Sequence, residues 1–249
     1  MKCMKHGGLY TGEYAERCGH SKASDPTTLE EQADYVVYTV NIRIDICRAI
    51  FGNNIFVGGQ GSYQEINDID TYGIYTSSSG RNYTEWRQDE GTTWGDIPIN
   101  VFAGQSMASV GCGVYSATML LTSVGIEKVT PGDAVALYDS NGSYKQTIEI
   151  ILQNNNMSNK VSTVNNEYDF IAMLEKGYGF MTYIEGPCNF SGGVHWIVVA
   201  EIRTSELGSS LGYDVYVLSS TGGGRGWNKI EDIIDNLETS NEFGICIED

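Results

Sequence analysis

The sequence predicts an α+β protein in which a group of helices precedes an antiparallel sheet. Apolar residues recur at helical spacing between about residues 111 and 177, and from residue 179 onward they form short runs typical of strands. Hydrophobic residues make up 41% of the 249-residue chain, with 30 Gly and only 4 Pro, which is the composition of a globular protein. The chain is therefore expected to fold.

The chain divides into two regions of different amino-acid composition. Glycines and serines multiply between residues 52 and 80, and the sequence becomes polar and turn-rich after Trp86. Residues 1–85 are accordingly assigned to a small N-terminal region of unknown role, and residues 86–249 to a second domain.

Three elements are expected in the N-terminal region. A helix is predicted to start near Pro26, after Ser24 and Asp25. Apolar and polar residues alternate over residues 40–47, which predicts a strand, although a helix remains open there. The short apolar stretch 72–75 predicts a further strand.

Four helices are expected in the second domain. The first opens at the glycines on either side of Cys112 and continues as an apolar run. Thr130 is placed at the N-cap of the second, with Pro131 at the first helical position, and Gly177 ends the fourth. The predicted helices cover residues 111–125, 129–142, 144–156 and 168–177.

Strands are expected to follow the helices. A glycine-rich loop, residues 221–226, and a helix-like segment, residues 227–239, precede the last of them. The loop does not match the phosphate-binding pattern G-x-x-x-x-G-K-[ST], so nucleotide binding is not expected. The predicted strands cover residues 179–185, 194–202, 213–220 and 243–248.

The charge of the chain limits its partners. The formal net charge is −17, with 15 Lys and Arg against 32 Asp and Glu, and binding to a phosphate backbone depends on basic residues. A nucleic-acid partner is therefore not expected. No window of about 18 apolar residues exists, and the first residues lack the apolar core of a secretory signal. A membrane partner is thus not expected either, and the protein is predicted to be cytoplasmic or released by a non-classical route.

The six cysteines are irregularly spaced and too sparse for a disulfide scaffold, so mostly free thiols are expected. Cys3, His6, Cys18 and His20 superficially resemble a zinc site, but the second pair is closer than most zinc spacings. No metal and no cofactor are predicted.

Two residues of the second domain point to nucleophilic catalysis. Cys112 precedes an apolar helix, and a cysteine at a helix N-terminus has its pKa lowered, which favours the reactive thiolate. His195 begins a predicted strand and is the only histidine outside the first 20 residues, so it is the one candidate base. A single cysteine or histidine at such a position is more often structural than catalytic. The surrounding motifs therefore have to distinguish the two roles.

The surrounding motifs resemble those of the papain-like cysteine peptidases of the bacteriocin-processing family and their relatives in phages and mobile elements. The resemblance covers roughly residues 86–249 and agrees in both order and spacing. The matching positions are Gln88 with Asp89, Trp94 with Gly95, Gly111 to Gly113, Thr130 and Pro131 with Asp133, and His195 with Trp196.

The resemblance implies a papain-like fold, in which a nucleophile helix packs against an antiparallel sheet, and a role for each matched residue. Cys112 would be the nucleophile and His195 the general base and later acid. Gln88 would donate, together with the Cys112 backbone N–H, to the oxyanion of the tetrahedral intermediate. Gln105, seven residues before Cys112, is the alternative to Gln88 as this oxyanion donor.

Two positions depart from the family pattern. Val114 replaces the proline that usually follows Cys-Gly. Ser219 and Ser220 stand where Asp-Pro is expected, so Ser219 takes the place of the residue that orients the histidine. A serine accepts the ring N–H but cannot stabilise an imidazolium with a full charge. The sequence leaves a slower enzyme or another orienting residue, such as Ser220 or Asp214, open.

The leading prediction is a cysteine peptidase that hydrolyses an amide bond of a peptide or protein through a thioester. The same residues would also serve a cell-wall amidase or endopeptidase that acts on peptidoglycan stem peptides. A third possibility, motivated by the missing Asp-Pro, is a catalytically weakened papain-like domain that only binds a peptide or partner.

Overall fold

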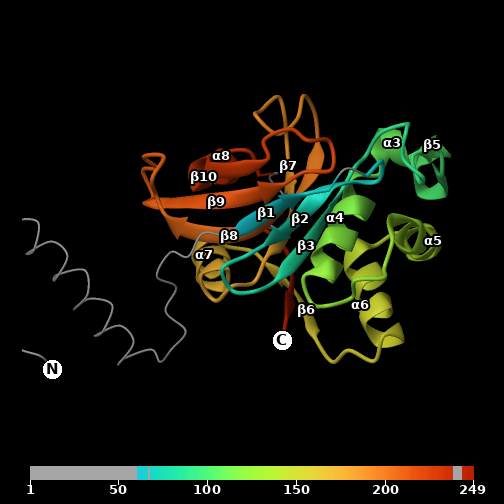
Figure 1. Ribbon diagram of the computed structural model, residues 1–249, viewed down its shortest axis with the longest axis horizontal. Helices are drawn as coiled ribbons and strands as arrows, with labels where there is room; N and C mark the ends of the chain where they lie inside the picture. The colour runs from blue at the N-terminus through green and yellow to red at the C-terminus, as the bar shows by residue number, and fades with distance from the viewer. Residues whose placement is uncertain (1–60, 67, 238–242) are drawn as a thin grey trace, which may run out of the picture. The chain divides into compact units, whose positions relative to one another are not determined.

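The computed structural model describes residues 61–66, 68–237 and 243–249. The elements predicted near Pro26 and over residues 40–47, and the Cys and His residues before position 21, lie outside these ranges. The described chain is an α+β fold with antiparallel sheets (Figure 1).

Helices α4, α5 and α6 precede the main sheet, as expected, but its strand β6 comes before α7. The strands are β1 (Ser62–Glu65), β2 (Thr71–Thr76), β3 (Asn82–Trp86), β4 (Pro98–Ile99), β5 (Gln105–Ser106), β6 (Lys160–Val164), β7 (Phe180–Ile184), β8 (His195–Thr204), β9 (Tyr213–Leu218), β10 (Gly226–Lys229) and β11 (Gly244–Glu248). The helices are the 3₁₀ turn η2 (Asn100–Phe102), α3 (Met107–Val110), α4 (Cys112–Thr122), α5 (Pro131–Asn141), α6 (Tyr144–Asn154), α7 (Glu167–Glu175) and α8 (Ile230–Ile234).

The main sheet has six strands in the order β10-β9-β8-β7-β11-β6, and every pair in it is antiparallel. Strand β8 lies inside this sheet and is buried along almost its whole length. In Figure 1, α4, α5 and α6 lie together, apart from α7 and α8. The sheet therefore has one apolar core on each face.

A bulge in β8 changes which side chains face which core. Val198 and Ala200 pack into the core that contains α4, and Ile197 and Val199 into the core of α7 and α8. The register with β9 shifts between Val199 and Glu201, and an extra residue in a strand reverses the alternation beyond it. Glu201 therefore lies on the α4 side of the sheet.

Strands β1, β2 and β3 form a separate antiparallel sheet that packs against α4. Tyr75 and Tyr83 are buried in the same core as the apolar face of α4. The compact unit that contains these strands runs from Gly58 to Asp249, whereas the sequence analysis placed a boundary between residues 85 and 86. The Gly- and Ser-rich stretch before Trp86 contains the turns of this small sheet.

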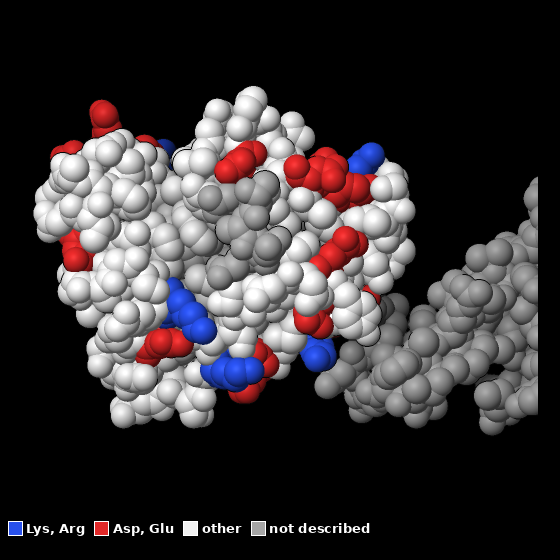
Figure 2. All heavy atoms as spheres, turned by 180° about the vertical axis from the view of Figure 1, so that it is seen from behind, with Lys and Arg blue, Asp and Glu red and all other residues white. Residues whose placement is uncertain are grey.

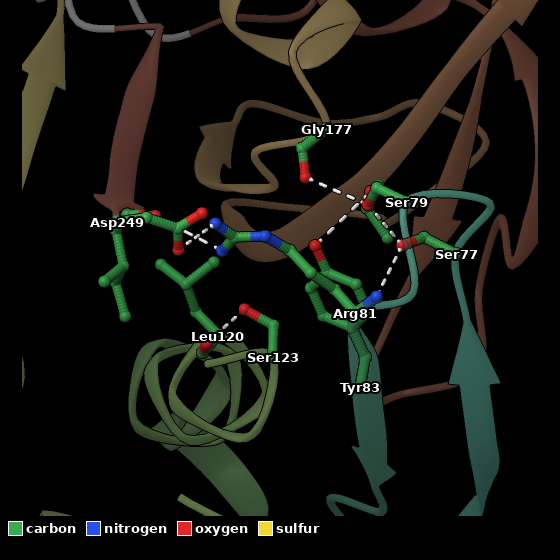
Figure 3. A network of polar contacts seen from close by, with 10 residues as sticks. Ser77, Ser79, Arg81, Tyr83, Leu120, Ser123, Gly177 and Asp249 are labelled. Carbon is green, nitrogen blue, oxygen red and sulfur yellow. Dashed lines mark hydrogen bonds and ion pairs between the residues drawn. The ribbon is translucent and has the colours of Figure 1, made fainter. Parts of the chain in front are cut away.

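The turn between β2 and β3 is held by polar contacts to distant parts of the chain (Figure 3). The Arg81 guanidinium donates to the Ile247 carbonyl over 3.3 Å and pairs with the Asp249 carboxylate at 2.8 Å. The Ser79 hydroxyl donates to the Gly177 carbonyl over 3.3 Å. These contacts fix the small sheet to the end of β11 and to the loop after α7.

The helix ends confirm the expected capping. Thr130 and Asp133 form a reciprocal capping box at the start of α5, with Pro131 at the first helical position. Gly177 follows α7 with a φ of 88°, a conformation that glycine adopts without strain. Helix α4 begins at Cys112, as the glycines around it predict.

Two segments differ from the expectation. Residues 227–229 belong to strand β10, and of the described part of the predicted helix 227–239, residues 227–237, only Ile230–Ile234 is helical. Trp227 pairs with Tyr216 of β9, and its ring meets that of Tyr216 at 5.4 Å, so tertiary pairing outweighs local propensity there. Strand β6, which the sequence analysis did not identify, pairs with β11.

Charged side chains are spread over the surface. On the face in Figure 2, acidic groups lie at several separate points, with a few basic groups between them and uncharged surface elsewhere. Within the described ranges, no helix has both the length and the apolar character needed to cross a membrane.

We expect Glu201 to be one of the residues on which the attachment of the small sheet depends. Its buried carboxylate accepts hydrogen bonds from the hydroxyls of Tyr75 and Ser78. Glu201→Ala leaves these donors without an acceptor and should lower the free energy of unfolding by roughly 2 to 3 kcal/mol, measured by urea denaturation. Glu127→Ala, at an exposed position, should leave it close to the wild-type value; equal effects of the two changes would contradict this account.

Candidate active site

Cys112 is the first residue of α4 and remains partly exposed. It follows the short helix α3 and Gly111, where a Cβ would collide with the Met107 carbonyl, so the turn between the two helices requires glycine. The backbone N–H groups of Cys112, Gly113 and Trp196 lie in hydrogen-bonding positions around the sulfur. The sulfur thus lies between the N-terminus of α4 and the start of β8.

The protonation state of Cys112 differs from the expectation. Burial raises the pKa of the Cys112 thiol, and it outweighs the three backbone N–H groups, which act in the opposite direction. The prediction of a lowered pKa considered only the helix N-terminus and was therefore wrong for this structure. Cys112 is a neutral thiol at pH 7.

The ring of Tyr144 covers the first turn of α4. A Cβ at position 113 would overlap the Tyr144 ring and hydroxyl, which accounts for the glycine after Cys112. Tyr144 stacks on Tyr138 with ring centroids 4.3 Å apart and meets the Trp196 ring at 5.2 Å. The thiol therefore has an aromatic neighbour that the sequence analysis did not identify.

His195 is the first residue of β8 and is 3% exposed. Its Nε2 atom lies 3.0 Å from the Ser219 hydroxyl and 3.4 Å from the Thr221 hydroxyl. Burial lowers the pKa of His195 to about 4, so the imidazole is neutral at pH 7. The carbonyl of the next residue, Trp196, accepts a hydrogen bond from the Ser116 hydroxyl of α4 over 3.0 Å, which joins the start of β8 to the helix that begins at Cys112.

Ser219 follows β9 and is fully buried. Its backbone N–H donates to Glu85 Oε1 over 3.0 Å, and Glu85 forms an ion pair with Arg225 at 2.7 Å. The Arg225 guanidinium also lies over the Tyr72 ring at 4.3 Å. The glycine-rich loop 221–226 is thereby fixed to β3, and Ser219 with it.

Gln88 is buried, and its side-chain amide is bonded at both ends. Nε2 donates to the Ala108 carbonyl over 3.1 Å, and Oε1 accepts a hydrogen bond from the Ser220 hydroxyl over 2.8 Å. Ala108 lies on α3, four residues before Cys112, so the amide lies near the start of α4. The rival Gln105 lies on β5 and is exposed.

The structure does not bring Asp214 to the histidine. Asp214 lies at the opposite end of β9 from Ser219, and it is buried. Its carboxylate accepts hydrogen bonds from the Ser205 hydroxyl and from the backbone N–H groups of Glu206 and Leu207. These bonds lower the pKa of Asp214 against the effect of burial, and they fix the turn between β8 and β9.

The sequence analysis missed Glu85 and Tyr144 as members of this region. Glu85 was assigned to the N-terminal region, and nothing in its neighbourhood marks it as buried. Arg225 was noted only as part of a glycine-rich motif. Within the described ranges, no group of three or more His, Cys, Asp or Glu side chains is placed to hold a metal ion.

Comparisons with known proteins add no assignment. A scan against protein-family models finds no match, and searches of the curated proteins and of the solved structures find none either. The functional argument therefore depends on the geometry of Cys112, His195, Ser219 and Gln88.

The buried neutral histidine should make the protein sensitive to acid. Because the folded-state pKa of His195, about 4, lies below the unfolded value of about 6.5, the unfolded chain takes up this proton first as the pH falls. Stability is therefore lost between about pH 6.5 and pH 4. From pH 7 to pH 5 the wild type should lose about 2 kcal/mol more than His195→Gln in urea unfolding.

The same measurement distinguishes the alternative protonation state. If the folded protein contains a thiolate and an imidazolium, the pKa of His195 is raised rather than lowered. The wild type would then lose less stability than His195→Gln between pH 7 and pH 5, and this result would contradict the neutral pair.

Proposed function

We propose that the described domain is a papain-like cysteine hydrolase that cleaves an amide bond through a thioester. The observation that carries the proposal is the convergence at the start of β8. The backbone N–H of Trp196 lies near the Cys112 sulfur, and the Ser116 hydroxyl of α4 donates to the Trp196 carbonyl over 3.0 Å. The neighbouring His195 ring is held by Ser219 at 3.0 Å. A nucleophile, a base and an orienting group in this order are the components of such a site.

The packing supports the finer fold assignment. Helix α4 begins with the proposed nucleophile and packs against β8, which begins with the proposed base. A nucleophile helix against an antiparallel sheet is what the motif resemblance implies. We therefore take the papain-like architecture as part of the proposal.

The proposed reaction starts from a neutral pair. His195 takes the thiol proton of Cys112 as the sulfur attacks the carbonyl carbon, and a C–S bond forms. The oxyanion is stabilised by the Cys112 backbone N–H and by the Gln88 amide. The C–N bond then breaks, His195 protonates the leaving amine, and water hydrolyses the thioester with His195 again as base.

Ser219 orients the imidazole without a charge. Its hydroxyl holds Nε2, which leaves Nδ1 for the proton exchange with the thiol. Because no carboxylate faces the ring in place of Ser219, the imidazolium formed during the reaction is stabilised less than in an enzyme with aspartate at this position. We expect a working but slower hydrolase, whose substrate is a peptide, including peptidoglycan stem peptides.

One observation favours the second candidate, a domain that binds a peptide or protein without cleaving it. Burial raises the pKa of the Cys112 thiol and lowers that of His195, so both groups are neutral at rest and no thiolate–imidazolium pair is preformed. The test must therefore measure bond formation at Cys112 and its dependence on His195.

Acylation of Cys112 by p-nitrophenyl acetate measures the proposed chemistry without a known substrate. The acetyl group on the Cys112 peptide is quantified by mass spectrometry, with Cys188 and Cys246 as internal references. His195→Ala should reduce the rate about 100- to 10,000-fold, because the general base is removed. Since both groups are neutral between pH 5 and pH 8, the wild-type rate should vary little over that interval.

A different pH profile would favour the binding domain. A rate that rises about tenfold per pH unit up to pH 8 and is the same in His195→Ala is that of an unassisted thiol. This outcome would remove the catalytic assignment of both Cys112 and His195.

A further inference from the structure

We propose that Ser220 is a positioning residue that holds the side-chain amide of Gln88 in place, with one amide N–H left to donate to the oxyanion. This inference deepens the proposed hydrolase function and rests on it. Ser220 stands at the position where the motif resemblance expects proline, a residue that has no hydroxyl.

The orientation of the amide follows from its two partners. The Ala108 carbonyl only accepts hydrogen bonds, so the amide atom 3.1 Å from it must be the nitrogen. The other end of the amide is then the oxygen, which takes the Ser220 hydroxyl at 2.8 Å. Rotating the amide by 180° would place two acceptor oxygens against each other at Ala108.

The Ala108 carbonyl therefore selects one of the two amide orientations, and the Ser220 hydroxyl holds the oxygen end of the amide in place. This orientation keeps a donor available. The Gln88 amide nitrogen carries two hydrogens, and the Ala108 carbonyl takes one of them. Within the described ranges, no second acceptor contacts this nitrogen. The remaining N–H is the one that we assign to the oxyanion, together with the Cys112 N–H.

Ser220 itself is held firmly. It is fully buried, and its carbonyl accepts the Gln88 backbone N–H over 2.8 Å, so its backbone and its hydroxyl both contact Gln88. The preceding residue, Ser219, is fixed by Glu85. Two consecutive serines thus have separate tasks: Ser219 contacts the base, and Ser220 contacts the oxyanion donor.

Two reactions at Cys112 separate these tasks. Acylation by p-nitrophenyl acetate passes through a tetrahedral oxyanion, whereas alkylation by iodoacetamide displaces iodide directly and forms none. Ser220→Ala should lower the acylation rate about tenfold or more and leave the alkylation rate unchanged. Ser219→Ala, which releases His195, should lower both rates, and Ser140→Ala on the exposed side of α5 should lower neither.

A double variant tests whether Ser220 acts through Gln88. Gln88→Ala should lower acylation about 100- to 1000-fold, as removal of an oxyanion donor does. Adding Ser220→Ala to it should cause no further loss, because the amide that Ser220 holds is already gone. Ser220→Thr, which keeps a hydroxyl, should retain most of the wild-type rate.

The outcomes distinguish this inference from the function on which it rests. Equal losses of acylation and alkylation in Ser220→Ala, or additive losses in the double variant, overturn the role of Ser220 alone. Absence of His195-dependent acylation in the wild type overturns the hydrolase, and this inference with it.

A measurement on the wild type covers the case in which Ser220→Ala does not fold. In the NMR spectrum of the full chain, the two Gln88 amide hydrogens should exchange at different rates, because only one is bonded to Ala108. Equal and fast exchange of both would overturn the fixed orientation.

Discussion

The carboxylate of Glu85 is the interaction on which the rest of the site depends. It is fully buried, and it binds the guanidinium of Arg225, the hydroxyl of Tyr63 and the backbone N–H of Ser219. A buried charge is tolerated only when it is paired and hydrogen-bonded, so these partners have little freedom to move apart. Glu85 thereby joins strands β1 and β3 to the loop after β9. That loop begins with Ser219 and Ser220, which contact His195 and Gln88.

Burial also sets the electrostatics of the site. The same packing that fixes His195 and Cys112 removes water from them, and desolvation favours the neutral form of each. The uncharged Ser219 beside the imidazole adds no negative charge that would favour the protonated ring, so burial sets the pKa of His195.

Local features of the sequence predicted much of this structure. The capping residues of α5, the glycine after α7 and the strands β7, β8, β9 and β11 are marked by short-range patterns, and so is the position of Cys112 at a helix start. The contacts of Glu85, Tyr144 and Glu201 join residues far apart in the chain, and no local pattern records them. The direction of the Cys112 pKa shift was missed for the same reason, since the burial of a thiol is a property of the packed core.

The order of strands in the main sheet has a consequence for how the protein assembles during synthesis. Strand β11 pairs with β7 on one side and with β6 on the other, although it follows both in the chain. On a nascent chain, β6 has no neighbouring strand until residues 244–248 have emerged and closed a loop of some eighty residues. Pairings of such long separation form slowly, so a ribosome-bound intermediate exposes the edge of β7 and an unattached β6. For that interval both strands present unpaired backbone N–H and C=O groups to chaperones or to other chains.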